Sequence, residues 1–168
     1  WQGCTQISEG CINCYAKTLA ERFKSVEWNA PPVRTSEQNW KKPYTWNRKA
    51  KKEGTTKLVF CASFADFFDK NVPDQWREDA YQVMKNTPNL IYLLLTKRPE
   101  IAVYKFPLHL SNVWLGVTIE NQKRAKERLP IIESLPFNKF LSIEPMLEPI
   151  AESMDLLNFK GIDWVIIG

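Results

Sequence analysis

Five short apolar runs recur along the chain after residue 57. They are Leu58–Ala62, Leu90–Leu95, Val113–Val117, Phe140–Ile143 and Trp164–Ile167. Several of them lack polar–apolar alternation, which is typical of parallel strands that are buried on both faces. Helical patterns lie between the runs, so the sequence predicts an α/β fold with right-handed crossovers. A partial (β/α) barrel and an open doubly wound sheet both fit this rhythm.

The helical patterns have recognisable starts and stops. One covers Cys14–Lys24, a second opens at Val72–Asp74 and closes at Thr87–Pro88, a third starts at Asn121, and a weaker one covers Ala151–Leu157. Asn121 is a good helix cap, and Val72-Pro73-Asp74 places a proline at a helix start. Pro130 falls inside the third pattern, where we expect it to kink or split the helix.

The segment from about 25 to 56 is different in character. Pro31-Pro32 and Pro43 are expected to interrupt any helix there, so we predict a long insertion that lies over a surface. Between residues 41 and 57, seven Lys and Arg face a single acidic residue, Glu53, although the whole chain carries a net charge of only +4. The basic excess therefore belongs to one segment.

Basic and aromatic residues together suggest a nucleic-acid surface, because cations neutralise phosphates and aromatic rings stack on bases. The candidates are Trp40, Lys41, Lys42, Trp46, Arg48, Lys49, Lys51 and Lys52. The alternative is a solvated loop whose aromatic side chains pin it to the barrel, since large rings are most often buried.

Composition favours one globular domain over residues 1–168. The chain is 44% hydrophobic and contains seven Trp and nine Phe, enough apolar mass for a full core. It begins at Trp1 and stops directly after an apolar run, so we expect it to be incomplete at both ends. No apolar run is long enough for a membrane span, and no secretory leader is visible, so we expect a reducing compartment, the cytoplasm.

In such a compartment, clustered cysteines favour metal or redox chemistry over disulfides. Cys4, Cys11 and Cys14 share one loop that leads into the first helix, where the helix dipole favours a thiolate at Cys14. Structural zinc needs four ligands, so Cys61 or His109 would have to complete the set. A redox thiol pair would make Cys4 superfluous. An iron–sulfur cluster with three protein ligands uses all three thiols and leaves one iron open.

Polar residues follow four of the apolar runs. Because ligand sites of α/β folds lie at the carboxyl ends of the strands, we expect these residues to meet at one mouth, facing the cysteines. With Tyr15 from the cysteine loop, the candidate cofactor-binding residues are Tyr15, Ser63, Asp66, Thr96, Lys97, Thr118, Glu120, Ser142 and Glu144. The alternative for each is an ordinary helix cap or turn residue. A weaker hypothesis is a zinc- or thiol-dependent hydrolase that uses Asp66, Glu120 or Glu144 as its base.

These motifs together resemble the bacteriophage gene-product 37/68 family, which is radical-SAM-like and has a three-cysteine motif. The similar stretches are Gly3-Cys4, Gly10-Cys11, Cys14-Tyr15-Ala16, Ser63–Phe68, Leu95–Pro99, Val113–Val117, Leu141–Pro145 and Asp163–Gly168. The resemblance implies a partial (β/α) barrel of the radical-SAM type. It also implies a 4Fe–4S cluster on Cys4, Cys11 and Cys14, with S-adenosylmethionine on the open iron and radical chemistry, by analogy on nucleic acid. A three-Cys-motif partner protein is a further implication of the family.

The sequence departs from the usual radical-SAM pattern in two respects. The cysteines are spaced C-x6-C-x2-C instead of C-x3-C-x2-C, and Asn13 stands where an aromatic residue usually precedes the last cysteine. The family also continues past Gly168 into a glycine-rich loop. The alternative function is a metal-bearing phage or mobile-element protein, with zinc or an iron–sulfur cluster, that binds nucleic acid or a partner without catalysis.

Overall fold

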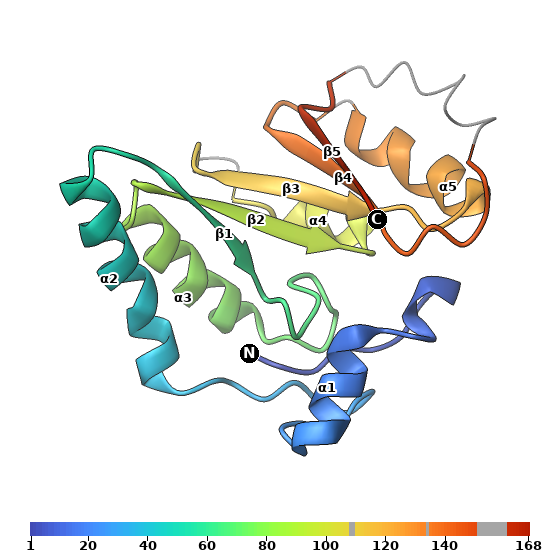
Figure 1. The fold of residues 1–168 in the computed structure, drawn as a ribbon, viewed down its shortest axis with the longest axis horizontal. Coiled ribbons are helices and arrows are strands. Elements are labelled where there is room, and N and C mark those ends of the chain that lie inside the picture. Colours follow the sequence, from blue (N-terminus) through green and yellow to red (C-terminus); the bar gives the residue numbers. More distant parts are fainter. Residues whose placement is uncertain (108–109, 134, 151–160) are drawn as a thin grey trace.

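A single curled sheet of five parallel strands forms the centre of the molecule (Figure 1). The computed structural model describes residues 1–107, 110–133, 135–150 and 161–168. The strands are β1 (Lys57–Cys61), β2 (Leu90–Thr96), β3 (Val113–Thr118), β4 (Lys139–Ile143) and β5 (Trp164–Ile167). They are therefore the five apolar runs of the sequence, with boundaries within one residue.

The strands follow one another in the sheet in chain order, β1 to β5, and every neighbouring pair is parallel. A doubly wound sheet would reverse its order at a switch point, and no reversal occurs among these strands. The structure thus confirms the partial (β/α) barrel and excludes the open doubly wound alternative.

One glycine lets the sheet curl around a large aromatic ring. Gly116 in β3 is the register partner of Phe140 in β4, and any side chain at 116 would overlap the Phe140 ring. Phe140 is fully buried. Gly116 therefore leaves the interior of the curl free for a ring that fills it.

Three of the predicted helices are present among the described residues, and two helices were not predicted. The predicted ones are α1 (Tyr15–Phe23), α3 (Asp74–Lys85) and α5 (Gln122–Glu133), and the unpredicted ones are α4 (Pro99–Lys105) and the helix α2 (Glu37–Lys52) described below. Asn121 caps α5 as expected, since its Oδ1 accepts a hydrogen bond of 2.8 Å from the backbone of Arg124. Pro130 does not split α5; it lies on the exposed side, where water can replace the missing backbone hydrogen bond. The weaker helical pattern at 151–157 lies outside the described residues.

The prediction that prolines interrupt any helix between 25 and 56 was wrong. Helix α2 runs from Glu37 to Lys52 with Pro43 inside it. Packing outweighs the cost of one missing hydrogen bond: Ala50 is completely buried, and Trp40 packs against the core. A predicted surface insertion is therefore partly a packed helix.

Helix α2 ends at the amino ends of the strands. Asn47 Oδ1 accepts hydrogen bonds of 2.9 and 3.0 Å from the backbone and side-chain nitrogens of Asn89, the residue just before β2. The amino-terminal segment with the cysteines and α1 lies instead beside the carboxyl ends (Figure 1). In the described ranges, no helix has the length and apolar character to cross a membrane.

Candidate functional site

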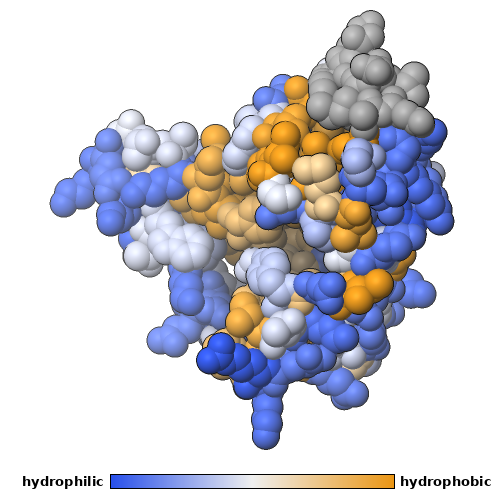
Figure 2. All heavy atoms as spheres, turned by 45° about the vertical axis from the view of Figure 1, so that its right-hand side comes forward, coloured by the Kyte–Doolittle hydropathy of each residue, from blue (hydrophilic) through white to orange (hydrophobic). Residues whose placement is uncertain are grey.

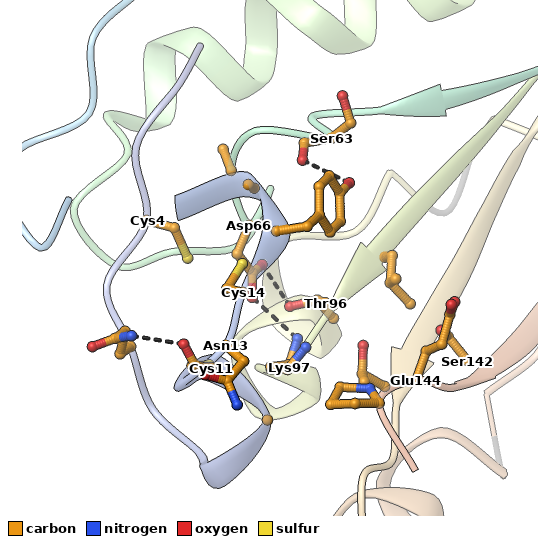
Figure 3. Close-up of a pocket in the computed structure, with 18 of the residues that line it drawn as sticks. Cys4, Cys11, Asn13, Cys14, Ser63, Asp66, Thr96, Lys97, Ser142 and Glu144 are labelled. Atoms are coloured by element: carbon orange, nitrogen blue, oxygen red, sulfur yellow. Dashed lines mark hydrogen bonds between the residues drawn. The ribbon is translucent and has the colours of Figure 1, made fainter. Parts of the chain in front are cut away.

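A pocket of about 590 Å³ opens at the carboxyl ends of the strands (Figure 3). Cys4, Cys11 and Cys14 all line it, and all three are free thiols. The same pocket is lined by Tyr15, Ser63, Asp66, Thr96, Lys97, Thr118, Ser142 and Glu144. The structure therefore brings the cysteine loop and the polar strand ends together, as expected. The volume of the pocket is in the range of about 300–1,000 Å³ that is usual for ligand pockets.

The three thiols share a pocket but do not form a closed metal site. Within the part of the chain that the structure describes, no three His, Cys, Asp or Glu side chains are grouped closely enough to hold a metal ion. Cys11 lies in a short 3-10 turn, Glu9–Cys11, and Cys14 is the N-cap of α1. The donor set itself suits an iron–sulfur cluster, because three free thiols on one loop line one cavity with room beside them.

The fourth cysteine of the chain lies away from this pocket and does not complete a zinc site there. Cys61 lies on β1 and lines a different cavity of about 310 Å³, between β1 and α2. Burial raises the pKa of Cys61 to about 11. The other candidate ligand, His109, lies outside the described residues.

Asp66 and Thr96 reach the pocket but are already engaged with protein groups. Asp66 Oδ1 accepts 2.7 Å from Thr96 Oγ1, and its Oδ2 accepts 2.7 Å from Arg98 Nη1 and 3.0 Å from the backbone of Lys97. Asp66 is only 6% exposed. This carboxylate ties the ends of β1 and β2 together and has little capacity left to bind a ligand.

Glu120 is the one predicted cofactor residue that does not line the pocket. It is fully buried beneath the cysteine loop, where Oε1 accepts 2.6 Å from Ser8 Oγ and Oε2 accepts 2.7 Å from Arg128 Nη1. Gly10 passes so close that a Cβ there would be 2.8 Å from Oε1 of Glu120. Glu120 therefore supports the loop from below, and a glycine at position 10 makes the close approach possible.

Two further strand-end residues, Thr118 and Ser142, line the pocket side by side. They are register partners on β3 and β4, so their side chains leave the same face of the sheet. Among the described residues, Thr118 Oγ1 is buried and has no hydrogen-bond partner. Because an unpaired buried hydroxyl is costly, Thr118 is a candidate to bind a polar ligand atom in the pocket.

Charged and aromatic groups complete the mouth of the pocket. Lys97 Nζ lies 3.7 Å from Glu120 Oε1 and still lines the pocket, and Glu144 is exposed on the far side. Tyr15 donates a 3.1 Å hydrogen bond from its hydroxyl to the backbone carbonyl of Ser63. Burial raises the pKa of Tyr15, so this tyrosine stays a neutral donor at neutral pH.

Burial raises the pKa of the Cys4 thiol to about 12, and the nearby carboxylate of Asp66 acts in the same direction, against Arg98. In the metal-free protein Cys4 is thus a neutral thiol at neutral pH. Because metals bind the thiolate, binding at Cys4 must release a proton.

The face around the pocket is apolar. Figure 2 shows apolar side chains gathered around a hollow on the side of the strand ends, with hydrophilic ones to either side. Phe60 and Leu147, which line the pocket, are 45% and 49% exposed. Such a rim can exclude water once a ligand covers it.

Five buried or half-buried residues that hold the site were not predicted. They are Thr5, Ser8, Asp69, Arg98 and Arg128. Arg98 stands directly after Lys97, and the local sequence does not indicate which of these two cations is buried. The others carry no local pattern, because their partners are distant in sequence.

The candidate nucleic-acid residues form a separate surface. The Lys and Arg candidates of α2 are exposed, whereas Trp40 packs inward, with the Arg34 guanidinium 4.0 Å from its ring. Trp46 is 41% exposed and is the one available for stacking. None of these side chains lines the cysteine pocket.

Comparison with known proteins gives a family without an assigned activity. The model of the family described as "Protein of unknown function (DUF5131)" matches residues 1–168, so the chain belongs to that family. Neither the curated proteins nor the solved structures gave a significant match.

Proposed function

We propose that this member of the family is a radical-SAM-like iron–sulfur enzyme. The observation that carries the proposal is that three free cysteines of one loop line the same pocket as the polar ends of four parallel strands. This supports the proposal, because thiols are potential metal donors and the polar side chains beside them lie at the end of a β/α barrel where ligand sites are found. The proposal locates the protein in the cytoplasm, where thiols stay reduced.

In this proposal Cys4, Cys11 and Cys14 hold a 4Fe–4S cluster with one open iron. When bound, this group would pass one electron from an external reductant to S-adenosylmethionine, which would split into methionine and a 5′-deoxyadenosyl radical. The chain's own residues bind and orient: Thr118 and Ser142 offer hydroxyls on the floor of the pocket, while Lys97 and Glu144 offer opposite charges at its walls. Phe60 and Leu147 keep water away from the reacting groups.

Anaerobic reconstitution with iron and sulfide tests the proposal. We expect bound iron with the visible absorption of a cluster, and 5′-deoxyadenosine after addition of S-adenosylmethionine and a strong reductant. Serine at Cys4, Cys11 or Cys14 should abolish cluster binding, whereas Cys61→Ser, the matched control in the other cavity, should retain it. A fully loaded cluster that cleaves no S-adenosylmethionine would defeat the enzymatic proposal.

The exposed cations of α2 favour a second candidate, a metal-bearing protein that binds nucleic acid without catalysis. Lys42, Lys51 and Lys52 are exposed on a helix that lies apart from the pocket. Zinc found by metal analysis, together with tight binding to nucleic acid, would support this candidate.

A partner protein of the three-Cys-motif type would be identified by co-purification from cells that express both chains.

A further inference from the structure

The first half of the cysteine loop crosses a buried cluster of charges. Arg98, only 3% exposed, lies under Thr5, between the carboxylates of Asp66 and Asp69. Its Nη1 donates 2.7 Å to Asp66 Oδ2, and its Nη2 lies 3.1 Å from Asp69 Oδ2. One guanidinium therefore faces two carboxylates that both come from the loop after β1.

The same guanidinium holds the cysteine loop. Arg98 Nη2 donates to the backbone carbonyl of Thr5 and, at 2.7 Å, to its hydroxyl, while Nη1 reaches to 3.8 Å from Cys4 Sγ. Asp69 Oδ2 completes the arrangement, since it accepts 2.7 Å from the Thr5 backbone and 2.6 Å from the Thr5 hydroxyl. Thr5 is thus bound from both sides, and Cys4 is the residue next to it.

We propose that Arg98 is a positioning residue that fixes Cys4 at the pocket before any metal centre is loaded. All of these contacts join protein atoms, so the metal does not have to make them. The inference rests on the proposed function only in taking Cys4 as a metal ligand. Glu120 holds the second half of the loop in the same way, through Ser8 and the close approach of Gly10.

The geometry requires an arginine at this position. A planar guanidinium can address Asp66, Asp69 and Thr5 together, whereas a lysine ammonium has one centre and cannot reach all three. Arg98→Lys keeps the charge and removes the fork. It therefore separates the positioning of the loop from simple neutralisation of the two carboxylates.

Hydrogen–deuterium exchange of the metal-free protein tests directly whether Arg98 holds the loop through Thr5. In Arg98→Lys we expect amides of residues 3–8 to exchange about tenfold faster or more, since a buried charge-assisted hydrogen bond is removed. The control is Lys139→Met, a change at a different buried cation whose ammonium donates to the backbone carbonyls of Glu133 and Leu135. The control should leave exchange in residues 3–8 unchanged.

Thr5→Val provides a milder variant in case Arg98→Lys does not fold, because it removes only the hydroxyl. We expect a smaller increase in exchange there, and in the double variant less than the product of the two single effects. Iron release to a chelator from the reconstituted protein should be faster in both single variants. If residues 3–8 exchange at the wild-type rate in both Arg98→Lys and Thr5→Val, Arg98 does not position the loop, and the inference is wrong. If the wild type and all the variants fail to bind iron, only the proposed cluster is wrong.

Discussion

The cysteine loop and helix α2 both depend on charged residues, but they use them in opposite ways. Under the loop, Arg98 and Asp66 meet at 2.7 Å with side chains only 4% and 7% exposed. On α2, Lys41 lies 3.5 Å from Glu37 with side chains 75% and 91% exposed. The first pair is held in one geometry by its surroundings, and the second is open to solvent and salt.

This difference teaches what each region can do. Removing one partner of a buried ion pair lowers the free energy of unfolding by several kcal/mol, and such a pair fixes the positions of its side chains. An exposed ion pair contributes about 0–1 kcal/mol to that free energy and leaves its side chains mobile. A site that must hold metal ligands needs fixed positions. A surface that binds a phosphate backbone needs only an accessible positive field. The carboxyl-terminal end of α2, with its lysines, lies at the amino ends of the strands, and the cysteine loop lies beside their carboxyl ends (Figure 1). We therefore interpret them as two sites.

Removing the charge of Glu120 should have the largest effect on the fold. In Glu120→Gln, Arg128 stays buried beside a neutral amide, and we expect the free energy of unfolding to fall by about 3–5 kcal/mol. Urea denaturation monitored by tryptophan fluorescence measures this change. Glu127→Gln, which removes an exposed partner of Arg124, should change the same free energy by less than about 0.5 kcal/mol. Equal decreases in the two variants would erase the distinction between buried and exposed pairs.

Acid should weaken the loop through Asp69. Burial alone would raise the pKa of Asp69, but hydrogen bonds from Thr5 and Asn71, and the charge of Arg98, hold it below its ordinary value of 3.8. A carboxyl with a lowered pKa in the folded state contributes stability above its unfolded pKa and loses it as the pH falls through the folded value. Asp69→Asn should therefore be less stable than the wild type by about 1–3 kcal/mol at pH values near neutrality.

The pH dependence of that difference is the decisive measurement. Urea midpoints of the wild type and Asp69→Asn should stay separated at neutral and mildly acidic pH and should converge as the pH drops below the ordinary Asp pKa of 3.8. A separation that does not shrink in acid would show that the charge of Asp69 is not what stabilises the loop.

The strands and the composition of the pocket were predictable because both follow from local patterns. A buried parallel strand is a short apolar run, and the carboxyl ends of parallel strands meet at one edge. Ser63, Lys97, Thr118 and Ser142 could therefore be placed at one mouth before any contact was known. The partial barrel required the strand order, which periodicity alone does not give.

The parts that were missed depend on distant partners. Ser8 and Glu120 are 112 residues apart, and Thr5 and Arg98 are 93 apart, so no local signal reveals their contacts. Glu120 was predicted to reach the pocket because a carboxylate at a strand end has the same sequence signature whether it lines a pocket or binds an arginine. Helix α2 was missed because propensity rules weigh Pro43 and cannot weigh the burial of Ala50.

Replacing exposed lysines of α2 should have the smallest effect on the fold. This change tests most directly the difference between α2 and the cysteine loop. Replacing Lys49, Lys51 and Lys52 by Gln should change the free energy of unfolding by no more than about 0.5 kcal/mol, because all three are exposed. Affinity for a short single-stranded oligonucleotide should fall, and the slope of log affinity against log salt should decrease by about 0.7 for each phosphate that the variant no longer neutralises. The control replaces Lys24, Lys70 and Lys85, exposed lysines elsewhere on the chain, so that net charge is matched.

If both triple variants weaken binding equally, α2 is not a specific surface. If the α2 variant also lowers iron loading of the cysteine loop, the two regions act as one site, since charges at the far end of the strands would otherwise have no route to the thiols.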